Sequence, residues 1–261
     1  MKSAIRSFGI IAAVAVIGFS MAGCGSGGGG AGSGHVGPIL SLGGQVWEVD
    51  GGYGFDAWNW TQFAGNRTVF SEAGGLGSIA AGQLDFSLAS PAASFLEDIF
   101  DHWLFENAAV SNPDVRGFIM NWSWSLCCYP LRTDTDVLVR ASQTVSGNRA
   151  VLEFAWYIFV DRDVTVRRAR MSGTWDEDGV TYSWVEPAFT VNLREGWNVM
   201  HFREEYVRTA TRATLTVTIS AGEPAHLRWA LYPLEEWELD YSGIVEFSSR
   251  AQRVRGSRPS R

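Results

Sequence analysis

The chain has 261 residues, of which 46% are hydrophobic and 13% aromatic, a composition typical of a globular protein with a sizeable core. Its formal net charge is −7 at pH 7, and all 28 acids lie between Cys24 and Phe247, where only 14 arginines oppose them. This acidic body lacks the basic surface that phosphate contacts require, so we expect no nucleic-acid partner.

Residues 1–23 have the features of a secretory signal peptide. Lys2 and Arg6 give a basic start, and the twelve residues 8–19 form an unbroken apolar run. A resident membrane-spanning helix needs ~20 apolar residues. A basic start, a short apolar centre and small residues after it instead predict a signal that is later removed.

Met21, Ala22, Gly23 and Cys24 follow the apolar run. This stretch resembles the lipobox of bacterial lipoproteins, in which an apolar residue and two small residues precede the processed cysteine. The resemblance implies a lipid thioether on Cys24, cleavage before it, and acylation of the new N-terminus, which together anchor the protein to a membrane. Gly25 stands where some bacteria use aspartate for inner-membrane retention, so the resemblance implies the outer membrane. The alternative is a plain signal peptide or N-terminal anchor that happens to contain cysteine.

Residues 24–38 are expected to form the lipidated cysteine and a flexible tether. Residues 25–34 consist only of glycine, serine and alanine. Such a chain behaves as a random coil with a span of roughly 20 Å. It would separate a lipid-bound end from a folded body.

Strand patterns dominate the predicted N-terminal β-rich region, 39–110, at residues 45–50, 57–63, 67–72 and 84–88. One short helix is predicted around 91–105. Ser90 suits the N-cap, Pro91 suits the first helical position, and the apolar residues that follow recur at helical spacing.

The predicted C-terminal region, 111–247, contains further strand patterns at 151–160, 164–175, 180–184, 197–203, 212–219 and 226–232. Many short strands with a single helix predict a mainly β protein, an antiparallel β-sandwich formed as one large or two small units. The body resembles, in general character, the exported β-rich domains of bacterial lipoproteins, although no motif carries over.

The remaining cysteines, Cys127 and Cys128, are neighbours on a predicted strand and therefore point to opposite sides of it. We expect two thiols. No paired CxxC or HExxH motif occurs, so no metal or other cofactor is predicted. Residues 248–261 carry five arginines and no acid, and they are expected to form a basic disordered tail, with contact to anionic lipid as the alternative.

Catalytic signals are weak, and no catalytic residue is predicted. No GxSxG motif is present. A glycosidase needs two carboxyl groups about 5 to 9.5 Å apart across a cleft. The neighbouring acids Asp161 and Asp163, and likewise Glu204 and Glu205, are more typical of charged hairpin ends.

The strongest candidate ligand site is the loop at residues 50–60, which combines glycines with aromatic and polar side chains. Sugar rings present apolar faces ringed by hydroxyl groups, and aromatic faces beside carboxylate and amide groups suit them. The predicted site residues are Tyr53, Asp56, Trp58, Asn59 and Trp60. The period-two spacing of Trp58 and Trp60 also fits two residues that fill a core.

The sequence therefore predicts a lipid-anchored cell-envelope module that binds or scaffolds, with a glycan or an envelope protein as its partner. Two alternatives remain. One is an envelope hydrolase that uses paired carboxylates. The other is a structural adhesion or assembly subunit that adds a strand to the edge of a partner.

Overall fold

The computed structural model describes residues 34–50, 57–71, 73–98, 105, 107–120 and 131–233. The predictions for the signal peptide, Cys24, Tyr53, Asp56, the two neighbouring cysteines and the arginine-rich tail therefore lie outside the described residues.

The predicted mainly β class is confirmed. The strands are β1 (His35–Gly37), β2 (Leu40–Asp50), β3 (Asn59–Gln62), β4 (Arg67–Phe70), β5 (Leu76–Ala80), β6 (Gln83–Leu88), β7 (Ala109–Val110), β8 (Gly117–Met120), β9 (Leu131–Arg132), β10 (Asp136–Ser146), β11 (Arg149–Val160), β12 (Val164–Arg168), β13 (Met171–Glu177), β14 (Val180–Glu186), β15 (Phe189–Leu193), β16 (Gly196–Arg208), β17 (Arg212–Ala221) and β18 (Arg228–Pro233).

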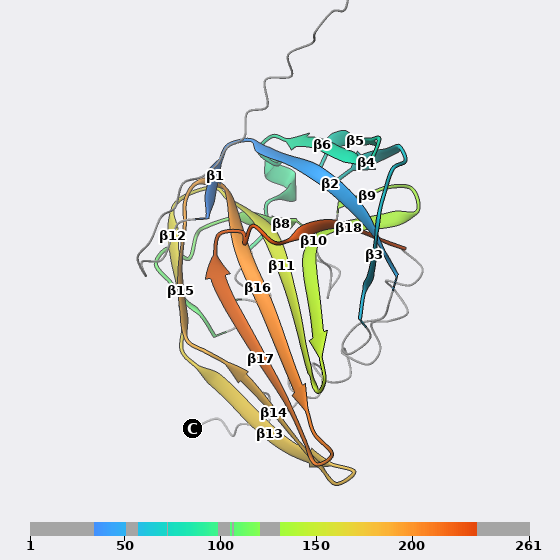
Figure 1. The fold of residues 1–261 in the computed structure, drawn as a ribbon. Coiled ribbons are helices and arrows are strands. Elements are labelled where there is room, and N and C mark those ends of the chain that lie inside the picture. The colour runs from blue at the N-terminus through green and yellow to red at the C-terminus, as the bar shows by residue number, and fades with distance from the viewer. Residues whose placement is uncertain are drawn as a thin grey trace, which may run out of the picture. The chain divides into compact units, whose positions relative to one another are not determined.

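Fifteen of these strands belong to one sheet, and β15, β12 and β7 form a second, smaller one (Figure 1). The main path runs β13-β14-β17-β16-β11-β10-β18-β2-β6-β5-β4-β9, and β9 also pairs with β10. The seven strands from β10 to β9 therefore close into a barrel, while β11, β16, β17, β14 and β13 continue the sheet as an open arm.

The predicted sandwich is wrong because the sheet closes on itself. Two short contacts complete the ring, since β9 pairs with β10 at Leu131 and Arg132 and with β4 at Arg132. Closure pairs the strand edges that an open sheet would leave free. The expected all-antiparallel arrangement is also wrong, because β18 pairs with β2, and β14 with β17, in parallel.

The strand β11 is buried along most of its length, and its residues are apolar on both faces. It pairs with β10, β16 and β8. Leu152, Phe154 and Trp156 point into one core, and Tyr157 and Phe159 point into another on the opposite face. A single strand thus supports two hydrophobic cores.

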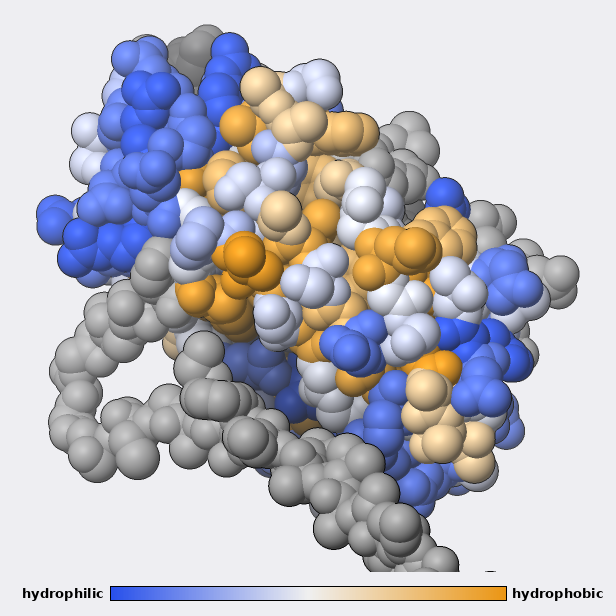
Figure 2. Space-filling view, turned by 90° about the horizontal axis from the view of Figure 1, so that it is seen from above, coloured by the Kyte–Doolittle hydropathy of each residue, from blue (hydrophilic) through white to orange (hydrophobic). Residues whose placement is uncertain are grey.

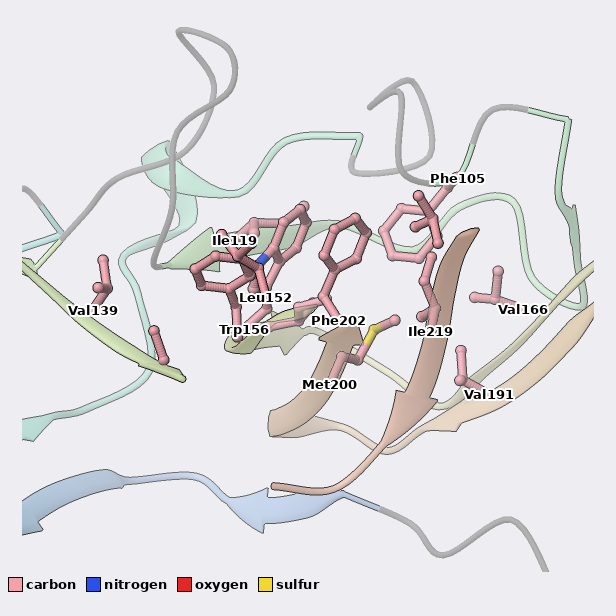
Figure 3. Packing of buried hydrophobic residues seen from close by; sticks show 14 of the residues in the cluster. Phe105, Ile119, Val139, Leu152, Trp156, Val166, Val191, Met200, Phe202 and Ile219 are labelled. Carbon is pink, nitrogen blue, oxygen red and sulfur yellow. The ribbon is translucent and has the colours of Figure 1, made fainter. Parts of the chain in front are cut away.

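The first core combines residues of the open arm and of the small sheet with residues of the ring strands β10 and β18. Trp156 stacks on Phe202 of β16, with ring centroids 5.1 Å apart, and Val166 and Val191 of the small sheet belong to the same cluster (Figure 3). The second core contains the inward residues of the ring. The strand β6 contributes Leu84, Phe86 and Leu88 by strict alternation.

The helix predicted over 91–105 is wrong over the described residues 91–98. These contain only one 3-10 turn, η1 (Ala93–Phe95), and Leu96 is already extended. The backbone of Glu97 exchanges hydrogen bonds of 2.8 and 2.9 Å with Gly117, so tertiary pairing replaces helical pairing here. Ser90 donates to the Pro38 carbonyl oxygen instead of capping a helix. In the described ranges, no helix has the length and apolar content needed to cross a bilayer.

Candidate functional site

Three of the predicted ligand-site residues, Trp58, Asn59 and Trp60, are described. The strand β3 pairs with the end of β2, so that Asp50 is opposite Asn59 and Val49 is opposite Trp60. Because successive strand residues point to opposite faces, Asn59 and Trp60 lie on opposite sides of this ribbon. The pleat therefore separates the amide from the aromatic group.

Trp58 is only 8% exposed and belongs to the first core. Its ring lies 5.5 Å from that of Trp60 and 6.3 Å from that of Tyr232, measured between centroids. Its backbone N–H donates to Gln143 Oε1 at 2.7 Å. Trp58 thus packs against Trp60 from within the first core.

Trp60 is half-buried and shares its face of the ribbon with Trp47 and Gln62. The guanidinium carbon of Arg228, on β18, lies 4.7 Å from the Trp47 ring centroid and 5.6 Å from the Trp60 ring centroid. An exposed cation–π contact contributes ~0.5–1 kcal/mol. We call this group, Trp47, Trp60, Gln62 and Arg228, the Trp–Arg site.

Sequence reasoning missed Trp47 and Arg228 because they meet through the parallel pairing of β18 with β2, which places Ala230 opposite Trp47. No local pattern indicates that pairing. A partial signal does exist, since the alternation of Leu227, Trp229 and Leu231 places Arg228 on the other face of its strand.

A second polar cluster, also missed, lies on β11, β16, β17 and the segment between β17 and β18. Both carboxylate oxygens of Glu153 meet imidazoles. Oε1 is 3.2 Å from His201 Nε2, and Oε2 is 2.9 Å from His226 Nε2. Ser220 Oγ is 3.5 Å from His201 Nδ1. Burial lowers the pKa of His201, and the Glu153 carboxylate partly opposes that effect.

Ser220, His201 and Glu153 follow one another in space as the nucleophile, base and acid of a catalytic triad do, but the contact between the serine and the histidine is long. The distance from Ser220 to His201 lies at the long limit for a hydrogen bond. The serine is also a cross-strand partner of His201 in the ladder, rather than a residue on a sharp turn. Within the described ranges, no group of three or more His, Cys, Asp or Glu residues is arranged to hold a metal ion.

The acids proposed for a hydrolase take part in structural pairs. Asp161 pairs with Arg162 at 3.0 Å, and Asp163 pairs with Arg194 at 2.8 Å. Glu204 is buried and accepts a hydrogen bond from Tyr206.

Its neighbour Glu205 pairs with Arg149 at 2.6 Å and with Arg203 at 2.7 Å. Hydrogen bonds from these two guanidinium groups lower the pKa of Glu205 to about 2. The Glu204–Glu205 carboxylates thus point to opposite faces of β16, as adjacent strand residues do.

A shallow cavity of about 430 Å³ lies at one end of the small sheet, lined by residues of β7, β12 and β15 and of the loops beside them. Arg168 on its wall is buried, pairs with Glu186 and lies over the Phe189 ring. Its charge is therefore compensated within the protein. The Trp–Arg site, at the solvent-facing margin of the first core, offers the more accessible set of binding groups.

Comparisons with protein-family models, with curated proteins and with solved structures find no match. The functional argument consequently rests on the chemistry of the chain itself.

Proposed function

We propose that this protein is a lipid-anchored binding module of the bacterial cell envelope that takes a glycan at the Trp–Arg site. The observation that carries the proposal is the Arg228 guanidinium, which lies over the rings of both Trp47 and Trp60. A guanidinium in contact with two indoles places N–H donors beside an apolar surface.

This combination suits a sugar ring. The apolar C–H face of the sugar would lie against an indole, as ligands do on aromatic platforms. Sugar hydroxyl oxygens, or the carboxylate of an acidic sugar, would accept hydrogen bonds from Arg228. Gln62 is exposed and supplies both an amide donor and an acceptor beside Trp47.

The expected location at the cell envelope also supports a glycan ligand. The Met-Ala-Gly-Cys order before a Gly/Ser tract favours lipidation of Cys24, and Gly25 favours the outer membrane. An anchored module can bind those envelope glycans that lie within the length of its flexible tether.

Glycan-array screening of the full processed chain, followed by calorimetric titration of the best-retained glycan, tests the proposal. Trp47→Ala is expected to weaken binding about tenfold, which corresponds to ~1.4 kcal/mol. Arg228→Gln, which removes the charge and leaves an uncharged amide on a shorter side chain, is expected to weaken binding severalfold. Thr61→Ala is the matched control, because Thr61 lies between Trp60 and Gln62 on β3 but faces the other way.

Circular dichroism of each variant separates loss of the site from loss of the fold. Equal affinity of the parent and both site variants would remove the Trp–Arg site from consideration. Failure of the parent to retain any glycan would count against the proposed ligand class.

A further inference from the structure

The outer face of the β2–β6–β5 sheet carries almost no charge. In register, Ser41 lies beside Ser87, which lies beside Leu76. Residues 34–47 and 73–96 contain one side chain of the Asp, Glu, Lys or Arg types, Asp85. In a protein body with twice as many acids as arginines, this face is the exception.

The large hydrophobic residues exposed in the described part of the chain are Val36, Ile39 and Leu76, with exposed fractions of 42%, 55% and 70%. Leu76 lies in register with Ser87, and Ile39 is two residues before Ser41, so both belong to this face. Val36 is three residues before Ile39, on β1. Viewed from above, this side of the protein is orange and white at its centre and blue toward its margins (Figure 2). We call Val36, Ile39, Ser41, Leu76, Ser78 and Ser87 the apolar face. Asp85, which lies opposite Ser78 on the exposed side of β6, is the single acid beside it.

The position of the tether supports a membrane as the surface that covers this face. The tether enters the described region at Gly34, whose carbonyl oxygen accepts a 2.6 Å hydrogen bond from the Val199 N–H. Val36 follows two residues later and Ile39 five residues later. The ten residues from Cys24 to Gly34 span at most about 35 Å when extended, and roughly 20 Å as a coil. A lipid on Cys24 would therefore keep the end of the body that carries Val36 and Ile39 close to a bilayer.

We propose that the apolar face rests on the membrane that holds the Cys24 lipid, with Ile39 and Leu76 entering the headgroup region. This inference rests on the proposed lipid anchor. Charge supports a lipid surface as the occupant, because anionic headgroups would repel an acidic body less at a face with a single acid. The tether raises the effective concentration, so a weak contact is sufficient.

The apolar face and the Trp–Arg site lie at different positions along β2. Along β2, Trp47 lies eight residues beyond Ile39, or roughly 26 Å at the usual strand rise. The Trp–Arg site would therefore stay accessible while the apolar face is covered.

Photocrosslinking of the full lipidated chain in vesicles of phosphatidylethanolamine and phosphatidylglycerol tests this inference. A benzophenone amino acid replaces Leu76 in one protein and Ser146, at the far end of β10, in the control. Vesicle sedimentation of the parent and of Cys24→Ser is measured in parallel, which reports on the anchor independently.

The residue-76 probe is expected to form at least fivefold more lipid adduct than the residue-146 probe in the sedimented protein. Adding Ile39→Glu should reduce the residue-76 adduct toward the control level. Equal yields at the two positions, with normal sedimentation, overturn the apolar-face proposal and leave the anchor intact. Cys24→Ser that sediments as fully as the parent overturns the anchor, and with it this inference. A residue-76 probe that captures protein and no lipid in whole envelopes also overturns it, in favour of a protein partner.

Discussion

Glu205 illustrates at the residue scale how the acidic body is stabilised. Its pKa falls from 4.5 to about 2 because Arg149 and Arg203 donate hydrogen bonds to its carboxylate. A carboxyl group whose pKa is lower in the folded than in the unfolded state stabilises the fold above the unfolded pKa. That stabilisation is lost as the pH falls through the folded pKa.

Glu205→Gln is therefore expected to lower the free energy of unfolding at pH 7 by ~1 kcal/mol, a value reduced by solvent screening of this partly exposed group. The variant should also lose part of the pH dependence between 4.5 and about 2. Urea unfolding across that pH range measures both effects. Glu195→Gln, at an exposed position, is the control, and equal pH profiles for the two variants would contradict the assignment.

At the same scale, the sequence predicted only part of the candidate site. Trp60 was identified from its loop, and the core alternative describes Trp58, which is buried. Asn59 was grouped with them by proximity in sequence, yet the pleat turns it to the other face. Arg228 lies far away in the chain and reaches Trp60 only because β18 joins β2 in the sheet.

At the scale of the element, close strand approach depends on glycine in β5. A Cβ atom on Gly77 would meet the Asp85 carbonyl oxygen and would lie 2.8 Å from Phe86 Cα, so β5 and β6 would have to separate. Gly77→Ala is expected to destabilise the protein by ~1–3 kcal/mol, measured by urea unfolding. Gly43→Ala on the neighbouring β2 meets its nearest atom at 3.4 Å and should have a much smaller effect. A larger loss in Gly43→Ala than in Gly77→Ala would show that the strand spacing is not limiting.

Some turns carry a strong local signal. The Asp-Gly pair between β13 and β14 is typical of a tight hairpin, and both Asp178 and Gly179 have the positive φ that such a turn requires. The pattern at 164–175 was interpreted as one strand, but it divides into β12 and β13, which belong to different sheets. The apolar stripe behind Pro91 predicts a helix, but Phe95 packs on the second core from the end of a single 3-10 turn and Leu96 packs on it from extended backbone.

At the scale of the whole molecule, the ring combines the two predicted regions. The strands β2, β4, β5 and β6 come from residues 39–110, and β9, β10 and β18 come from residues 111–247. The Trp229 indole N–H donates to the Gly43 carbonyl oxygen across 186 positions of sequence. Local periodicity predicts strands but carries no information about such partners, which is why the class was predicted and the closure was not.

The shared ring leads to a prediction about unfolding. Because β10 and β11 carry residues of both cores, the described body is expected to unfold in one cooperative step. Far-ultraviolet circular dichroism and tryptophan fluorescence should give coincident urea transitions. Ile79→Ala in the second core and Leu193→Ala in the first should each move that single transition, by about 2–5 kcal/mol. If Ile79→Ala shifted one transition and left a second one unmoved, residues 39–110 and 111–247 would be separate folding units that merely share strand pairs.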